Sequence, residues 1–310
     1  MVKPVYIFCG FLDSGKTLAI KESLWDDNFN GGEKTLIVVF EKGDEEYDED
    51  FLEDTNSEVV YYQKLEDLTK EEMKKIDKMY RPDRVIIELN GLQDETPMFQ
   101  PDFFIDNWDI AQVLTFFDGS TLRMYMNNMK QFVYNHTVNS EEIYINRCSE
   151  DDVLFFRNNL KAINPTAMIS FLDKDNKFIT ITQQLFDTSS KELFISDSDY
   201  GLWYIDCVDD PYKYDDCKIT LTMQYVETLD EYENVCVMGR KAMVCCSNDI
   251  QDAAITVVNV DPKVVSDGEF YQVTGKLKCL ETPEFTTCVL YADDYQKTAA
   301  PKEYFVNFNY

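Results

Sequence analysis

The first half of the chain alternates short, continuously apolar runs with longer polar or amphipathic stretches. Runs without hydrophobic alternation are typical of strands that are buried on both faces of a parallel sheet. The stretches between them have the length and pattern of helices. We therefore predict an α/β fold, a parallel sheet with helices on both faces. The expected strands are 4–9, 34–41, 58–64, 83–89, 111–119, 141–147 and 167–173, and the expected helices are 15–25, 65–80, 120–135 and a last one that ends near Asn164.

The pattern changes after about residue 195, where strand-like runs follow one another with only turns between them. No helix-length amphipathic segment interrupts these runs, which favours a small β-rich, barrel-like (OB-like) domain. We therefore predict two domains, 1–195 and 196–310, joined within 173–197. The expected strands of the second domain are 201–207, 218–226, 242–246, 254–260, 269–280, 287–293 and 303–308.

The charge of the chain narrows the classes of partner. There are 58 acidic and 29 basic residues, a formal net charge of -29. Such a field repels nucleic acid and anionic membranes, so we expect no nucleic-acid partner. No apolar run approaches the length of a bilayer span and no signal peptide is recognisable, so we expect no membrane insertion and a cytoplasmic location. In that compartment the nine cysteines are expected as free or metal-bound thiols.

One motif joins the first apolar run to the first helix. "GFLDSGKT" fulfils the phosphate-loop pattern through Gly10, Gly15, Lys16 and Thr17, and a strand and a helix flank it as that pattern requires. Backbone N–H groups of such a loop surround a phosphate, the lysine bridges the β- and γ-phosphates, and the threonine hydroxyl binds Mg²⁺. The nucleotide-binding residues expected here are Gly10, Leu12, Asp13, Ser14, Gly15, Lys16, Thr17 and Leu18.

Beyond this loop the sequence resembles the CobW-like branch of P-loop GTPases, relatives of HypB and UreG. The similarity spans about residues 3–170 and is carried by "PVYIFCGFLDSGKT", "DRVIIELNGL" (83–92) and "VLTFFDG" (113–119). It implies GTP and GDP as ligands and Mg²⁺ as cofactor. The family's Glu-x-x-Gly motif falls on Glu88 and Gly91, which implies that Gly91 gives its N–H to the γ-phosphate. A carboxylate where Glu88 is expected, at the end of a strand beside the phosphate loop, can hold Mg²⁺ or orient the attacking water.

An acidic stretch, "FEKGDEEYDEDFLED" (40–54), follows the second expected strand, where the family places its first switch segment. Glu41 and Gly43 align with the Asn-Glu-Phe-Gly pattern usual there. Clustered carboxylates suit a hard cation, but a solvated acidic loop is the favoured interpretation of such a run. Glu41 is the residue we single out as a third Mg²⁺ ligand beside Thr17 and Glu88.

Base recognition departs from the usual Asn-Lys-x-Asp. The chain has Asn146, Arg147 and Ser149 in its place. Asn146 can bind the base edge and the Arg147 stem can lie along its plane. Ser149 lacks the carboxylate that accepts from guanine, unless Glu150 or Asp151 replaces it. Asp13 stands where the family usually has glycine, and a carboxylate there opposes phosphate binding.

Candidate transition-metal ligands are few. The Cys-x-Cys-Cys motif of proposed metallochaperones in the family is absent, because no cysteine lies between residues 10 and 147. His136 is the one histidine, and near the end of an expected helix we predict it on the surface. "MGRKAMVCCSNDIQDAAITV" (238–257) resembles a module of bacterial permease-associated proteins. Within it Cys245 and Cys246 are candidate Zn²⁺ ligands, with buried free cysteine as the favoured alternative.

The motifs together favour a Mg²⁺-dependent P-loop hydrolase that binds and hydrolyses GTP as a switch. The family resemblance implies a link to metal homeostasis or metal insertion, with a client metalloprotein or a membrane permease as candidate partners. Two alternatives stay open at this point. One is a regulatory module that holds nucleotide with little hydrolysis, and the other is a relative that uses ATP.

Overall fold

The computed structural model describes residues 2–181, 184–229, 231–243, 250–282, 286–306 and 308. The chain divides into two compact units. The first comprises Met1–Phe156 and Ala167–Ile181, and the second comprises Arg157–Thr166 and Thr182–Tyr310. The division passes through α7 (Val153–Ile163), so this one helix belongs to both units.

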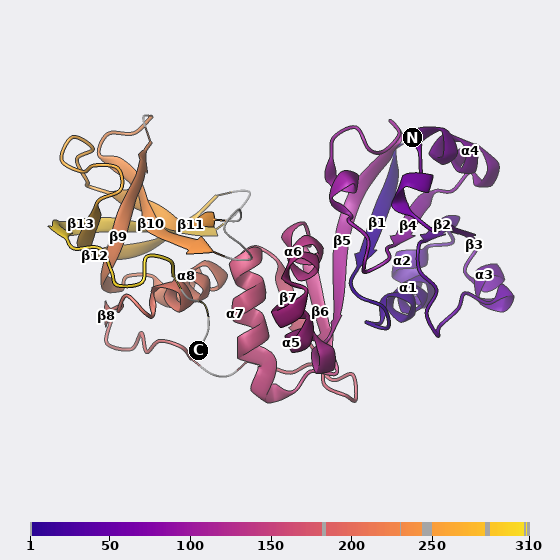
Figure 1. Cartoon of the computed structure of the whole chain (residues 1–310), viewed down its shortest axis with the longest axis horizontal. Helices are drawn as coiled ribbons and strands as arrows, with labels where there is room; N and C mark the ends of the chain where they lie inside the picture. The colour runs from indigo at the N-terminus through magenta and orange to yellow at the C-terminus, as the bar shows by residue number, and fades with distance from the viewer. Residues whose placement is uncertain are drawn as a thin grey trace. The chain divides into compact units, whose positions relative to one another are not determined.

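The first unit is built on a seven-stranded sheet, drawn from indigo to magenta in Figure 1. Its strand order is β3-β2-β4-β1-β5-β6-β7, and every pairing is parallel. The central strand β1 pairs Ile7 with Ile87 of β4 and with Val113 of β5. This confirms the predicted α/β class. The strands are β1 (Lys3–Cys9), β2 (Thr35–Val39), β3 (Ser57–Tyr61), β4 (Arg84–Glu88), β5 (Trp108–Asp118), β6 (Glu142–Asn146) and β7 (Met168–Phe171).

Helices cover both faces of this sheet, as predicted. Successive strand residues point to opposite faces, and Ile7 and Phe8 of β1 accordingly lie in different core clusters. On the Ile7 face, α4 (Lys70–Tyr80) buries Met73 and Ile76. On the Phe8 face, α1 (Lys16–Trp25) buries Ile20 and Leu24, and α3 (Glu49–Asp54) buries Phe51. Continuous apolar strands are therefore explained by burial on both sides.

Two predicted helices are broken. The stretch 120–135 forms α5 (Gly119–Asn128) and α6 (Lys130–Val138), because Met129 has non-helical angles of φ -134° and ψ 42°. The stretch 65–80 forms a 3₁₀ turn, η1 (Leu65–Asp67), and then α4, whose start is set by the Thr69 hydroxyl accepting from the Glu72 N–H. The remaining short helices of this unit are α2 (Asp27–Asn30), η2 (Thr96–Phe99) and η3 (Glu150–Asp152).

The second unit contains a closed five-stranded barrel, orange to yellow in Figure 1. Its strands follow the order β9-β10-β11-β13-β12, and pairings of β9 with both β10 and β12 close the ring. This confirms the predicted OB-like barrel. A short strand, β8 (Glu192–Phe194), adds to β9 in parallel. The barrel strands are β9 (Lys218–Thr228), β10 (Val235–Met243), β11 (Ile250–Val258), β12 (Phe270–Glu281) and β13 (Thr286–Thr298).

Two strand predictions in this unit are wrong, and most of a third, 242–246, lies outside the described residues, since β10 ends at Met243. Residues 201–207 lie in a helix, α8 (Tyr200–Asp209), which is followed by η4 (Pro211–Tyr214). Trp203 and Cys207 of α8 are fully buried in the barrel core. Because this helix is buried on most sides, its short apolar run shows no helical periodicity in the sequence. In 303–308, Val306 makes a single bridge to Ala242 and packs in the same core, and none of the described residues of this stretch lies in a strand.

No helix among the residues described above combines the length and the apolar character needed to cross a membrane.

Candidate functional site

The phosphate loop connects β1 to α1. Gly15 caps α1 at φ +101°, in the left-handed region that glycine adopts without steric cost. The first turn of α1 has no acidic residue and no side-chain cap. Its first N–H groups therefore point out of the helix without a side-chain acceptor, which makes this end a binding site for an anion.

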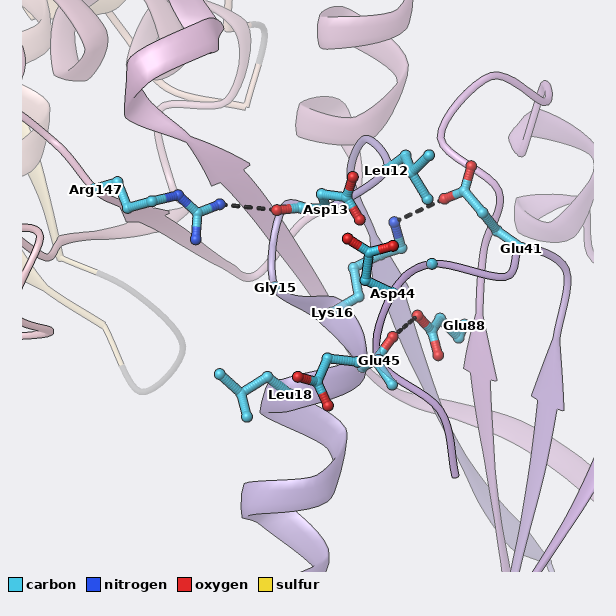
Figure 2. Close-up of a pocket in the computed structure, with 12 residues that line it drawn as sticks. Leu12, Asp13, Gly15, Lys16, Leu18, Glu41, Asp44, Glu45, Glu88 and Arg147 are labelled. Atoms are coloured by element: carbon cyan, nitrogen blue, oxygen red, sulfur yellow. Dashed lines mark hydrogen bonds and ion pairs between the residues drawn. The ribbon is translucent and has the colours of Figure 1, made fainter. Parts of the chain in front are cut away.

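A cavity of about 290 Å³ opens at this helix start. Figure 2 shows it between the phosphate loop, the segment after β2 and the end of β4. Most of the predicted nucleotide and Mg²⁺ residues line it. Of the others, Gly10 and Ser14 belong to the loop itself, and Asn146 and Gly91 contact the loop. The predicted residues that line the cavity are Leu12, Asp13, Gly15, Lys16, Thr17, Leu18, Glu41, Glu88 and Arg147.

The ammonium group of Lys16 is buried and fully bonded. Its Nζ donates to the carbonyl oxygens of Gly10 and Phe11, both at 2.8 Å, and to Oε2 of Glu41 at 3.1 Å. A lysine has three donors, so a phosphate oxygen must replace one of these partners. The Glu41 carboxylate is the one on a side chain, and Figure 2 shows the contact.

Glu88 lies at the end of β4 and is 3% exposed. Thr17 Oγ1 donates to its Oε1 at 2.6 Å, and the Tyr47 hydroxyl donates to its Oε2 at 2.6 Å. Burial raises the pKa of Glu88, against the two hydrogen bonds, which lower it. Sequence reasoning missed Tyr47, for which the one signal was an aromatic residue inside the acidic stretch 40–54.

The oxygen donors of this cavity suit Mg²⁺. The Thr17 hydroxyl and the Glu88 carboxylate are within hydrogen-bond distance of each other, and Glu41 lines the same cavity. Carboxylate and hydroxyl oxygens beside a phosphate site are the ligands that this hard cation prefers. The residues present therefore fit the cofactor that the phosphate-loop pattern requires.

Gly91, three residues beyond Glu88, packs against the backbone of the phosphate loop. A Cβ built on it would lie 2.5 Å from Phe11 Cα and 2.6 Å from the Gly10 carbonyl oxygen. No side chain fits there without a backbone shift. The segment after β4 is therefore in direct contact with the loop that would surround a phosphate.

Asn146 and Arg147 follow β6 at the other end of the cavity. Asn146 Nδ2 donates to the Ser14 carbonyl oxygen at 2.6 Å, whereas its buried Oδ1 has no partner among the described residues. The Arg147 guanidinium donates to Asp118 Oδ2 and to the Asp13 carbonyl oxygen, each at 2.8 Å (Figure 2 shows the second). An unpartnered buried acceptor is costly without a ligand.

The acidic residues that were alternatives to Ser149 do not reach the cavity. Glu150 and Asp151 are exposed and belong to η3, and neither lines it. Of the base-reading groups, the structure therefore places Asn146 and Arg147 beside the loop and no carboxylate in the position of the missing aspartate.

The surface position predicted for His136 is wrong. The residue is 1% exposed, and its ring lies against the rings of Phe11 and Phe117. Its Nδ1 is 2.6 Å from Oε1 of the buried Glu95, and its Nε2 is 3.0 Å from the Gly91 carbonyl oxygen. These two partners compensate the burial of a polar ring. Both are distant from His136 in the sequence, so nothing in the sequence indicated them. The candidate Zn²⁺ ligands Cys245 and Cys246 lie outside the described residues.

A family match covers the part of the chain that contains the phosphate loop. The family model of the CobW/HypB/UreG nucleotide-binding domain matches residues 4–169. Among solved structures, the chain is similar to the hydrogenase maturation factor HypB from Archaeoglobus fulgidus, with 16% sequence identity and a TM-score of 0.40. That alignment covers 57% of this chain and 84% of the other. No curated protein matches the chain.

Proposed function

The chain belongs to the CobW/HypB/UreG family of nucleotide-binding proteins, and from that premise we propose that it is a cytoplasmic, Mg²⁺-dependent switch that binds and hydrolyses GTP. One observation carries the proposal. Lys16, Thr17 and Glu88 meet in one cavity at the start of α1, where no side chain caps the helix, as phosphoryl transfer to water requires. Its place in the cell would be metal homeostasis or metal insertion, with a client metalloprotein or a membrane permease as partner.

Catalysis in this site is positioning and charge neutralisation. Lys16 exchanges Glu41 for oxygens of the β- and γ-phosphates, and N–H groups at the start of α1 hold the β-phosphate. When bound, Mg²⁺ supplies the remaining positive charge on the phosphate oxygens. Glu88 gives up the hydrogen bond from Thr17 and orients the attacking water, while Gly91 N–H contacts the γ-phosphate.

Turnover is expected to be slow. Arg147 is the arginine of the cavity lining, and its guanidinium already donates to Asp118 and to the Asp13 carbonyl oxygen. Without a free arginine to stabilise the transition state, intrinsic hydrolysis in P-loop proteins is slow. The segments 40–54 and 88–98 would change arrangement on hydrolysis and pass the nucleotide state to a partner.

A second candidate function is a regulatory module that holds nucleotide and hydrolyses little. Two observations favour it. Lys16 already has three acceptors, and the exposed Asp13 lines the cavity at φ +58°. The free Oδ1 of Asn146 also leaves an ATP-using relative open, since an acceptor suits the adenine amine.

Calorimetric titration with non-hydrolysable GTP and ATP analogues, each with Mg²⁺, tests the proposal. We expect selective GTP binding by the natural chain and loss of at least tenfold in affinity in Lys16→Ala. Lys21→Ala is the matched control, because Lys21 is on the same helix and contacts Glu45, Asp48 and the Glu46 carbonyl oxygen outside the loop. Tight binding of the analogue, together with no phosphate release from GTP in a parallel hydrolysis assay, would support the second candidate. Equal binding of both analogues would support an ATP-using relative, and no binding would contradict all three.

A further inference from the structure

A second group of ligand-type side chains lies in the first unit, outside the nucleotide cavity. Cys9, Glu95 and His136, which we call the inner cluster, each offer one ligand atom, and these atoms lie within 4.8 Å of one another. Their exposures are 1%, 2% and 1%, and none of the three lines the nucleotide cavity. They come from the end of β1, the residue before η2, and α6.

The tautomer of His136 is set by its surroundings. Because the Gly91 carbonyl oxygen can only accept, the proton lies on Nε2, which is 3.0 Å from it. Nδ1 then faces Oε1 of Glu95 at 2.6 Å. A neutral imidazole would direct a lone pair at a carboxylate, so either a proton or a cation must lie between them. A backbone carbonyl that holds the far ring nitrogen is the usual support of a metal-bound histidine.

Glu95 points to a cation rather than to a proton alone. Its second oxygen, Oε2, is buried and has no hydrogen-bond partner among the described residues. A buried carboxylate oxygen without a donor is costly, because desolvation is not compensated. A proton shared with His136 satisfies only Oε1. A metal ion bound by both side chains neutralises the carboxylate as a whole.

We propose that Cys9 Sγ, the Glu95 carboxylate and His136 Nδ1 bind a divalent transition-metal ion of the Zn²⁺ type. Sulfur, nitrogen and oxygen donors together match the preference of this ion, whereas Mg²⁺ prefers oxygen alone. The ion binds the Cys9 thiolate, and the thiol proton is released to solvent. The two charges of the ion balance one thiolate and one carboxylate.

The position of the inner cluster links it to the nucleotide site. Cys9 immediately precedes Gly10 of the phosphate loop, and His136 holds the carbonyl oxygen of Gly91. Metal binding therefore fixes both sides of the contact between the phosphate loop and Gly91. This coupling rests on the proposed function. Since linkage is reciprocal, we expect about a fivefold or larger difference in metal affinity between the GDP-bound and the GTP-analogue-bound protein.

The test uses the full chain with Cys245→Ser and Cys246→Ser, which removes the other candidate thiolates. The protein is freed of metal and nucleotide and titrated with Co²⁺ as a spectroscopic substitute for Zn²⁺, then with Zn²⁺. We expect one equivalent bound, with a thiolate-to-cobalt charge-transfer band. Adding Cys9→Ser should abolish the band and weaken Zn²⁺ binding at least tenfold. Cys148→Ser is the matched control, a buried cysteine of the same unit outside the cluster, and should change nothing.

Two outcomes overturn the site: no charge-transfer band in the parent protein, or the same band and affinity after Cys9→Ser. Circular dichroism of the metal-free variants shows whether they fold. Should Cys9→Ser fail to fold, Glu95→Gln decides in its place, because it keeps the side-chain size and should lower Zn²⁺ affinity at least tenfold. If the protein binds Zn²⁺ with equal affinity in both nucleotide states, the coupling is contradicted and the metal site is not. If the protein binds metal but no nucleotide, the proposed function is contradicted and the metal site is still supported.

Discussion

The Lys16 ammonium has two alternative sets of partners, the carboxylate of Glu41 or the phosphates of a nucleotide. The Lys16 and Glu41 side chains are only 3% and 12% exposed, so the ion pair is little screened by solvent. Glu41→Gln should raise Mg²⁺-free nucleotide affinity about threefold to tenfold, since a pair of this kind contributes on the order of 1 kcal/mol. The gain should shrink with Mg²⁺, for which Glu41 is a candidate ligand. Calorimetry with and without chelator measures both.

Glu45→Gln is the control for that measurement. Glu45 lines the same cavity, and its exposed carboxylate is 3.6 Å from Lys21 instead of Lys16. Removing it takes away the same charge without releasing the phosphate-loop lysine. Equal affinities of both variants in chelator would mean that the Lys16–Glu41 pair does not compete with the nucleotide.

Glu88 should make stability depend on pH with a sign opposite to that of most carboxylates. Burial raises its pKa in the folded chain, so the protonated form is stabilised. Its favourable contribution is complete below the unfolded value of about 4.3 and is lost as pH rises through the raised folded value. Glu88→Gln cannot ionise, so near neutral pH it should be more stable than the natural chain.

Urea unfolding at pH 5 and pH 8, with nucleotide turnover at pH 8, checks this expectation. The stability difference should be larger at pH 8 than at pH 5, while Glu88→Gln lowers turnover by a factor of about 10² or more. A difference that is the same at both pH values would mean that Glu88 does not carry the pH dependence.

Single residues differ in how far the sequence determines their role. The phosphate-loop residues were predictable because the motif fixes four positions at set spacing, and the loop then places them around one cavity. Tyr47 and His136 have no such spacing. Their burial depends on Glu88 and on Glu95, partners 41 residues away in each case, and only the folded sheet brings these together.

At the scale of elements, charge pairs connect α7 to α8 within the second unit. Asp209 of α8 pairs with Arg157 and Lys161 of α7, whose side chains are 9% and 7% exposed. Asp209→Asn takes this carboxylate from two nearly buried cations. Because Asp209 is itself 30% exposed and Arg157 keeps Asp206 at 3.7 Å, we expect a cost of about 1–3 kcal/mol, less than for a fully buried pair. Urea unfolding followed by circular dichroism measures the change. Asp216→Asn, which removes an exposed pair with Lys278, should change the free energy of unfolding much less, because solvent screens that pair.

The same measurement has a pH dependence that contrasts with that of Glu88. Burial raises the pKa of Asp209, but Arg157 and Lys161 outweigh that effect and lower this pKa below its usual value. The stability it contributes is therefore present above the unfolded pKa and is lost as pH falls through the folded value. The effect of Asp209→Asn should be full at pH 7 and decline below about pH 4. A constant effect over that range would contradict the pairing.

Elements were predictable where periodicity or length was distinctive. The parallel strands and the OB-like barrel follow from continuous and alternating runs bounded by turns. The run 201–207 did not distinguish strand from helix, because its apolar residues are buried on every side of α8. The helix break at Met129, which separates α5 from α6, is not marked by a glycine or proline in the sequence. The hydrophobic pattern also continues through it.

At the scale of the whole molecule, the net charge of -29 opposes the arrival of an anionic nucleotide. The cavity shares this sign, because its described lining has more acidic than cationic side chains. The acidic ones are Asp13, Glu41, Asp44, Glu45 and Glu88, and the cationic ones are Lys16 and Arg147.

Salt should therefore speed nucleotide binding, the reverse of its effect on proteins that bind nucleic acid. Raising ionic strength from 0.01 M to 0.15 M shortens the screening length from about 30 Å to about 8 Å, so the repulsion from distant carboxylates is removed while Lys16 still acts at contact distance. We expect the association rate of a fluorescent guanine nucleotide, followed by stopped flow at fixed Mg²⁺, to rise severalfold. Sucrose of matched viscosity should not reproduce the increase. A rate that falls with salt would mean that local attraction at the start of α1 outweighs the field of the whole chain.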